Sequence, residues 1–199
     1  MSFDLLSALA LFALITSSTP GPNNLMLMAS GGNYGFRQTI PHMLGIVFGF
    51  MSMLLLVGLG LIRLFEAYPI IYVVLKWLSV AYLLYLAWKI ATAAPLRRDS
   101  GRGTPLTLLQ AAAFQWVNPK AWAFGLSVVA VYAPQVSPPW LMLVALIVAA
   151  CSLPAITIWT AMGQQLARVL TNPRRLRLFN WSMALLLVLS LYPVIWSAA

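Results

Sequence analysis

Two short polar segments interrupt long apolar runs, and they hold the side chains best suited to bind a ligand. The first is Thr-Pro-Gly-Pro-Asn-Asn at 19–24, and the second is Gln-Trp-Val-Asn-Pro-Lys at 115–120. Proline and glycine disfavour a continuous helix, so each segment should break one. In a bilayer, backbone groups freed by such a break are tolerated only where they are buried in protein or line a wet cavity. Each segment is therefore a candidate binding site.

The first segment combines amide side chains with a new helix start. Asn23 and Asn24 supply donors and acceptors, and Gly21 lets a ligand approach the backbone. The half-helix expected after Pro22 would present free N–H groups at a positive dipole end, which suits a carboxylate. Alternatively, the segment is a proline kink whose asparagines only satisfy freed backbone groups. Five polar or helix-breaking residues exceed what a kink requires, which favours a binding site.

The second segment is notable for Lys120, with Asn118 and Gln115 as further polar contacts. A lysine at membrane depth costs roughly 2.5–3.5 kcal/mol on insertion scales. Lys120 lies about 15 residues into its run, or roughly 22 Å at the rise of a helix, which is too deep for easy snorkelling. It could contact an anion or carry a proton. Alternatively, it is a structural charge held by backbone carbonyls that Pro119 frees.

The remaining titratable residues are few. His42, the only histidine, titrates near neutral pH and is a second proton-coupling candidate beside Lys120, although a histidine simply hydrogen-bonded at the membrane boundary is the favoured interpretation. The three acids and the single cysteine do not provide the three or four ligands of a metal site or the facing carboxylates of a glycosidase. We therefore expect no metal, no cofactor and no enzymatic activity. The acids and the cysteine are Asp4, Glu66, Asp99 and Cys151.

The composition is that of an integral membrane protein. Of 199 residues, 62% are hydrophobic and only 8% are charged, and the mean hydropathy is +0.89. Soluble domains carry about 25% charged residues. The apolar runs are long enough for membrane helices and lack the alternating segments of an outer-membrane barrel. The net charge of +9 sits at the ends of apolar runs, so we do not expect a nucleic-acid partner. The fold class is thus all-α and polytopic.

We expect six spans in a single transmembrane domain over residues 1–199, with the first and fourth spans interrupted. Dividing the chain gives a repeat at about 3–93, a cytoplasmic linker at about 94–104 and a second repeat at about 105–197. Each repeat has three spans, so the two would be inverted. Interrupted helices at matching positions are a pointer to the midplane site of a secondary transporter. The expected spans are 3–33, 39–63, 69–93, 105–133, 139–162 and 177–197.

Basic residues predict the orientation. They gather in the loops after the first, third and fifth spans, while the opposite side has only Arg63 and Lys76. By the positive-inside rule these loops face the cytoplasm, and both termini lie in the periplasm. The residues concerned are Arg37, Lys89, Arg97, Arg98, Arg102, Arg168, Arg174, Arg175 and Arg177.

Glycines mark packing or moving interfaces in the spans. Gly45 and Gly49 lie four residues apart and could permit close helix packing, or they could line a moving interface. Gly58, Gly60 and Pro154 are interpreted in the same way, as packing or hinge features.

The two broken segments belong to a wider set of motifs that resembles the LysE/RhtB family of bacterial amino-acid exporters. The other members are Tyr-Gly-Phe-Arg at 34–37, Gly45 with Gly49, and Tyr-Leu-Leu-Tyr-Leu-Ala-Trp-Lys at 82–89. Together they run through four of the six spans. Within the family, Pro-Asn-Asn and Leu-Ala-Trp-Lys-Ile-Ala-Thr are most similar to the exporter type for cysteine and O-acetylserine.

The resemblance implies an inner-membrane efflux carrier driven by the proton gradient, with both broken segments in its transport machinery. LysE itself is similar but has an acidic residue in its second span, which this sequence lacks. Neutral zwitterions such as cysteine, O-acetylserine, homoserine or threonine therefore fit better than a cationic substrate. A passive channel and a structural membrane subunit remain the alternatives, and the sequence leaves open whether the chain forms a homo-oligomer. The expected substrate-binding residues are Gly21, Pro22, Asn23, Asn24, Gln115, Asn118 and Lys120.

Overall fold

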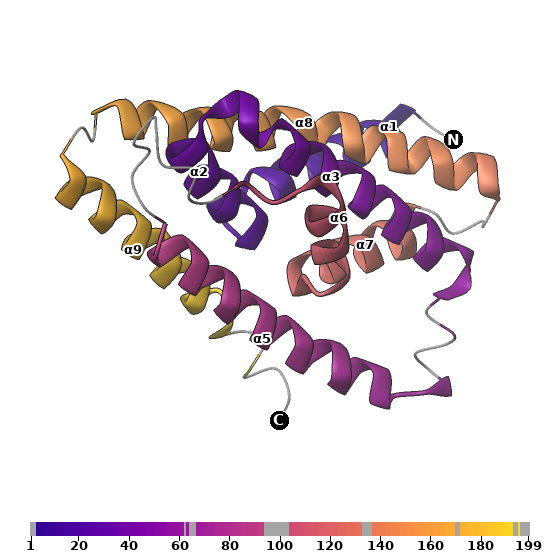
Figure 1. The fold of residues 1–199 in the computed structure, drawn as a ribbon. Coiled ribbons are helices and arrows are strands. Elements are labelled where there is room, and N and C mark those ends of the chain that lie inside the picture. The colour runs from indigo at the N-terminus through magenta and orange to yellow at the C-terminus, as the bar shows by residue number, and fades with distance from the viewer. Residues whose placement is uncertain are drawn as a thin grey trace.

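The computed structural model describes residues 3–61, 63, 67–93, 104–132, 137–169, 172–192 and 195. Glu66, Asp99, Arg97, Arg98 and Arg102, together with most of the expected linker, lie outside these residues. The described part consists of helices and short connections (Figure 1). The helices are α1 (Phe3–Ser18), α2 (Pro22–Tyr34), α3 (Phe36–Leu56), α5 (Ile70–Ala91), α6 (Leu108–Trp116), α7 (Pro119–Tyr132), α8 (Pro138–Val169) and α9 (Pro173–Leu189), and α3 continues in the π-helical turn η1 (Val57–Leu61).

Both predicted helix breaks are confirmed. The first separates α1 from α2, which are bent by 56° relative to each other. The second separates α6 from α7 at residues 117–118. Pro22 and Pro119 each begin the helix that follows its break, where a missing N–H costs no intrahelical hydrogen bond. The sequence therefore encodes both where one helix stops and where the next starts.

The number of membrane-spanning helices is confirmed only in part. Within the described residues, three helices are long and apolar enough to cross a membrane: Phe36–Leu61, Val73–Ala91 and Pro138–Arg168. The bent pair of α1 and α2 makes up to four. The remaining two expected spans fall short because α6 and α7 have only 9 and 14 residues and α9 has 17. The fifth expected span is longer than predicted, since α8 continues beyond residue 162 to Val169.

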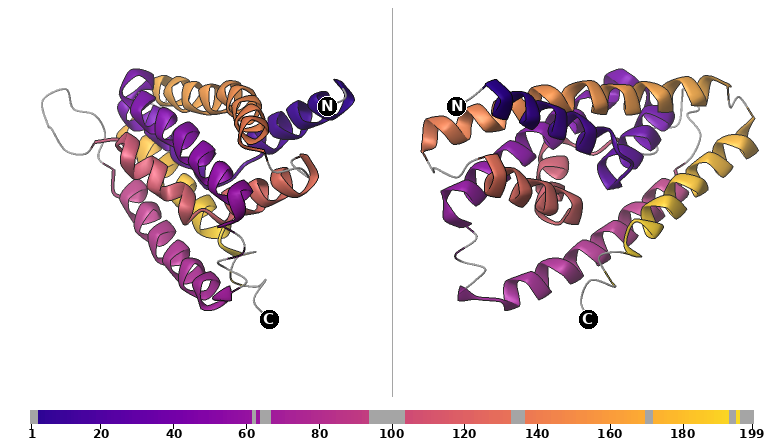
Figure 2. Two further views of the ribbon diagram at one scale, coloured as in Figure 1. Left: turned by 90° about the vertical axis from the view of Figure 1, so that its right-hand side faces the viewer. Right: turned by 180° about the vertical axis from the view of Figure 1, so that it is seen from behind.

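The helices are arranged in two groups with the short broken pair between them. The long helix α8 lies beside α1, α2 and α3, while α5 and α9 pack together on the opposite side (Figures 1 and 2). The short helices α6 and α7 lie between the two groups, and α6 packs against α3. This arrangement brings the two breaks side by side, with Asn24 and Asn118 buried while Thr19 and Pro20 remain exposed.

Glycines bring two helix pairs into close contact, α2 with α8 and α3 with α6. A methyl group at Gly31 would collide with the Thr160 carbonyl of α8, and one at Gly163 would collide with the Met28 carbonyl of α2. Gly45 faces the backbone of α6 in the same way, as does Gly49. The prediction that Gly45 and Gly49 permit close packing is confirmed, and a role in a moving interface stays a prediction.

At two further positions glycine is needed for different structural reasons. Gly58 leaves room for the side chain of Leu141, so it is a packing position. Gly60 adopts a φ of 107° within η1, a conformation that other residues rarely adopt. Pro154 lies inside α8, which continues through it.

The outer surface of the described helices is strongly apolar. Large side chains such as Ile70, Trp77, Trp88, Leu109 and Leu178 are all more than half exposed. Such an extensive apolar surface is unusual in a soluble monomer. Together with the apolar helices, it indicates a multi-pass membrane protein whose outer faces contact lipid.

Candidate functional site

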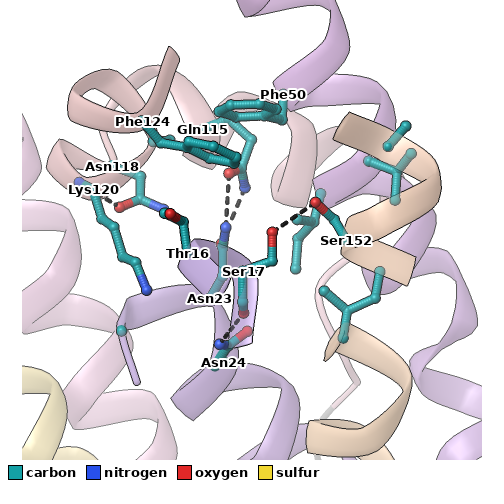
Figure 3. Close-up of a pocket in the computed structure, with 16 residues that line it drawn as sticks. Thr16, Ser17, Asn23, Asn24, Phe50, Gln115, Asn118, Lys120, Phe124 and Ser152 are labelled. Carbon is teal, nitrogen blue, oxygen red and sulfur yellow. Dashed lines mark hydrogen bonds between the residues drawn. The ribbon is translucent and has the colours of Figure 1, made fainter. Parts of the chain in front are cut away.

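The two helix breaks meet at one cavity between α1, α2, α3, α6, α7 and α8 (Figure 3). Its volume is about 70 Å³. One water position needs about 10–15 Å³, so the cavity has room for a few waters or one small polar molecule. All of the predicted substrate-binding residues except Pro22 line it. The lining comprises Thr16, Ser17, Gly21, Asn23, Asn24, Ile46, Val47, Phe50, Gln115, Asn118, Lys120, Ala121, Phe124, Ala149, Ser152 and Ile156.

A pair of amide side chains joins the breaks. Asn23 donates from Nδ2 to Gln115 Oε1 at 2.8 Å, and Gln115 donates from Nε2 to Asn23 Oδ1 at 3.1 Å. Gln115 also donates to the Ala111 carbonyl of its own helix at 3.0 Å, which fixes its side chain. Gln115 is fully buried. The pair therefore satisfies two polar groups that would otherwise be costly in an apolar interior.

Lys120 forms the second link between the breaks. Its Nζ donates to the Thr19 carbonyl at 2.8 Å, to Thr19 Oγ1 at 2.7 Å and to the Pro20 carbonyl at 3.4 Å. The side chain passes over Gly21, where an added Cβ would lie 2.7 Å from Lys120 Cδ. The structural alternative, in which Pro119 frees the carbonyls, was wrong about their source, because they belong to Thr19 and Pro20 in the break between α1 and α2. An anion contact by Lys120 stays a prediction.

Asn24 and Asn118 each satisfy backbone groups at a break. Asn24 donates from Nδ2 to the Ser17 carbonyl at 2.7 Å and to the Thr19 carbonyl at 2.8 Å. Asn118 Oδ1 accepts from the backbone N–H of Lys120 at 3.2 Å, as expected of a residue that caps the start of α7. The Nδ2 group of Asn118 has no acceptor among the described residues. Both asparagines thus have structural contacts and also face the cavity.

The start of α2 presents backbone donors to the same cavity. Gly21 precedes the helix in an extended conformation and supplies no side-chain cap. The N–H groups of Asn23 and Asn24 lie in the first turn, where a helix offers no internal acceptor. The positive end of the α2 dipole is therefore directed at the cavity.

Hydroxyl and aromatic groups complete the cavity, and they are not among the site residues predicted from the sequence. Ser17 Oγ lies 2.7 Å from Ser152 Oγ, which links α1 to α8. Phe50 and Phe124 stack with ring centroids 5.0 Å apart and planes inclined by 19°. The clustered hydroxyls that precede Thr19 could have indicated Ser17. Nothing local identifies Ser152, because only the tertiary fold brings it to the break.

His42 lies away from this cavity. It is 1% exposed, and neither ring nitrogen has a hydrogen-bond partner among the described residues. The favoured interpretation of a histidine hydrogen-bonded at the membrane boundary was therefore wrong. His42 lines a second, smaller cavity near the other end of α2.

Comparison with known proteins places these features in a wider context. The family model described as LysE type translocator matches residues 14–191. A cysteine/O-acetylserine efflux protein of Escherichia coli (strain K12) is 32% identical over 190 residues, which cover 94% of this chain and 96% of that protein. A cysteine/O-acetylserine efflux protein of Shigella flexneri is 32% identical over 186 residues, which cover 92% of this chain and 94% of that protein. No solved structure matches the chain.

Proposed function

The chain belongs to the LysE type translocator family, and from that premise we propose that it is a secondary exporter of neutral amino acids or their derivatives across the bacterial inner membrane. Cysteine and O-acetylserine are the first candidate substrates, because they name the relatives that match almost the whole chain. Homoserine and threonine are the second, since they share the size and the neutral polar side chain.

One observation carries the proposal: two interrupted helices from different halves of the chain face a single cavity. Polar backbone at membrane depth is tolerated in such a place because it lines a binding site. The cavity has a cation, amides and hydroxyls on one side, and the apolar side chains of Ile46, Phe50 and Phe124 on the other. Such a lining suits a small zwitterion with a short side chain. No carboxylate lines it among the described residues, which disfavours a cationic substrate.

In the proposed binding mode, the substrate binds polar groups of the two helix breaks, several of which contact one another in the structure. The substrate carboxylate would bind at the start of α2, near the N–H groups of Asn23 and Asn24, and then replace Thr19 as the partner of Lys120. The substrate ammonium would bind backbone carbonyls at the breaks and the amide oxygens of Asn24 or Asn118. Binding would thus exchange contacts between the breaks for contacts to substrate. This gives the ligand different affinity for two arrangements of the helices, as alternating access requires.

We also propose that the transporter consists of two inverted repeats. Exchange of the repeats would pair α1 with α6 and α3 with α8, so it would match the α1–α8 contact with the α6–α3 contact. The α3–α8 and α5–α9 contacts would each map onto themselves. In the proposed orientation, the ends of α2, α5 and α8 face the cytoplasm and both termini are periplasmic.

The decisive experiment is efflux from vesicles loaded with labelled O-acetylserine or cysteine, with a proton gradient imposed and then removed by an uncoupler. The wild type should drive substrate against its concentration gradient, and the uncoupler should abolish this. Unlabelled cysteine, threonine, homoserine and lysine would rank the substrates by competition, and lysine should compete least.

Variants test the assigned site. Asn23→Ala and Lys120→Met should lose efflux while remaining in the membrane, because each removes a proposed substrate contact. Lys76→Met is the matched control, since Lys76 lies on α5 and contacts the carbonyl of Ile195 instead of either break. Normal efflux by both site variants would remove the assigned site. Uncoupler-insensitive flux that only equalises concentrations would instead indicate a passive channel, and absence of transport by the purified chain would indicate a structural subunit.

A further inference from the structure

The second cavity lies at the end of α2 opposite the helix break. Its volume is about 50 Å³, and α2, α3, α5 and residues 104–106 line it. Two of its polar side chains are fully satisfied. Ser30 bonds Thr39 at 2.9 Å, and Asn33 exchanges two amide hydrogen bonds with Asn180 at 2.8 and 3.0 Å. His42 differs from them, because both of its ring nitrogens lack a partner.

An unpartnered buried imidazole needs an explanation. Leaving a buried polar group unsatisfied costs about 1–3 kcal/mol, and most such groups in folded proteins bind protein, water or a ligand. The helices around His42 are packed closely, since Gly45, on the next turn of α3, contacts the backbone of α6. The cavity is thus the space from which a partner for His42 can come.

The charge of the cavity indicates the partner. Lys89 is the only charged side chain among the described residues that line it, and no carboxylate does. A neutral imidazole offers one N–H donor and one acceptor. A lysine and an imidazole donor in one cavity suit a carboxylate, and Tyr34, which lines the same cavity, carries a hydroxyl that offers a further polar contact.

The two cavities follow each other along the same pair of helices. On α2, Asn23 lines the first cavity and Met26, one turn later, lines the second. On α3, Ile46 lines the first and His42, one turn earlier, lines the second. Met26 and Ile46 are buried in the same apolar cluster. Buried apolar side chains, Met26 and Ile46 among them, thus lie where the linings of the two cavities adjoin along α2 and α3.

We propose that the second cavity is an entrance site, in which His42 and Lys89 hold the carboxylate of a cytosolic amino acid before it passes between Met26 and Ile46 to the first cavity. This rests on the proposed export function and its cytoplasmic orientation. In this entrance site His42 contacts the substrate directly, in a cavity separate from the helix breaks.

The single histidine of the chain allows a direct test. The full chain, purified with a histidine-free tag and placed in lipid nanodiscs, would be labelled with ¹⁵N in its imidazole. Titration with O-acetylserine should shift the His42 nitrogen signals saturably. The methyl ester of the same amino acid, which lacks the carboxylate charge, should shift them at least about tenfold less readily, as expected for loss of a charge-assisted hydrogen bond.

Variants separate this site from the first cavity. Lys89→Gln should weaken the titration, and Lys76→Gln, the matched control on the same helix, should leave it unchanged. Asn23→Ala should abolish export yet keep the His42 response. Loss of that response in Asn23→Ala, an equal response to the methyl ester, or unchanged His42 signals in a protein that still exports would each overturn the entrance site. Failure of the export function itself would show separately, as absence of efflux by the wild type.

Transport kinetics provide a second readout. His42→Leu should raise the half-saturating cytosolic concentration about tenfold with little change in maximal rate, because it removes a contact to the charged substrate. His42→Gln retains a donor and an acceptor and should fall between the wild type and His42→Leu. An unchanged half-saturating concentration in His42→Gln and His42→Leu would contradict the proposal. If His42→Leu fails to fold, a wild-type value in His42→Gln together with an absent ¹⁵N response would do so.

Discussion

Alanine substitution of Asn23 and Gln115, singly and together, measures the link between the two helix breaks. The pair shares two amide hydrogen bonds of 2.8 and 3.1 Å. A neutral hydrogen bond contributes about 0.5–1.5 kcal/mol net, and side-chain bonds between membrane helices average about 0.6 kcal/mol. We therefore expect a coupling free energy of about 1–2 kcal/mol, with the double variant less destabilised than the sum of the single variants.

The single variants should differ from each other. Gln115 is fully buried and also donates to the Ala111 carbonyl, whereas Asn23 is only partly buried. Gln115→Ala should thus cost about 2–3 kcal/mol, and Asn23→Ala about 1–2 kcal/mol. The order of the two costs is a separate test of the geometry.

The assay is reversible unfolding in mixed micelles with increasing denaturing detergent, followed by circular dichroism. The control cycle pairs Asn23 with Ser127, an α7 residue whose hydroxyl bonds the Ala123 carbonyl of its own helix at 2.8 Å. That cycle should be additive to within about 0.5 kcal/mol. A coupling as small as this between Asn23 and Gln115 would refute the contact between the breaks.

Two further predictions concern the contacts of α8. Gly163→Ala should destabilise the protein by about 1–3 kcal/mol, seen as a lower melting temperature in micelles, because the new methyl group would collide with the backbone of α2. Gly125→Ala, whose methyl group would meet only the end of a flexible side chain at 3.2 Å, should melt near the wild type; equal melting of both variants would contradict the α2–α8 contact. Ser17→Cys with Ser152→Cys, in a Cys151→Ser background, should form a disulfide on oxidation, because the serine oxygens lie 2.7 Å apart, and the disulfide should stop efflux until it is reduced. Absence of cross-linking on non-reducing gels would place α1 elsewhere.

The helix breaks could be predicted because their cause is local. Pro20, Pro22 and Pro119 cannot continue a hydrogen-bonded helix, and a lysine at membrane depth, as Lys120 is expected to be, needs polar partners. The identity of those partners could not be predicted, because the Lys120 contacts span 101 residues of sequence. Sequence therefore located the polar groups, and only the fold showed that the two breaks satisfy each other.

Other features depend on tertiary structure throughout. The hydroxyl of Ser152 and the ring of Phe50 carry no local sign of lining a cavity, since a serine or phenylalanine in an apolar helix usually packs. His42 was placed at the membrane boundary from its position near the start of a span. His42 is buried because α2, α5 and the segment before α6 cover it. The hydrophobic periodicity of α3 alone does not predict this burial.

The hydrogen bonds between the two breaks also have a consequence for biosynthesis. Asn23 bonds a residue that is 92 positions later in the chain, so in a growing polypeptide that has not reached Gln115 the side chain of Asn23 lacks this partner. During insertion, the break between α1 and α2 must stay hydrated or shielded by the insertion machinery until α6 and α7 emerge. Ribosome-bound chains stopped before residue 115 should therefore remain accessible to water-soluble reagents at position 23, and chains stopped well after residue 132 should become protected.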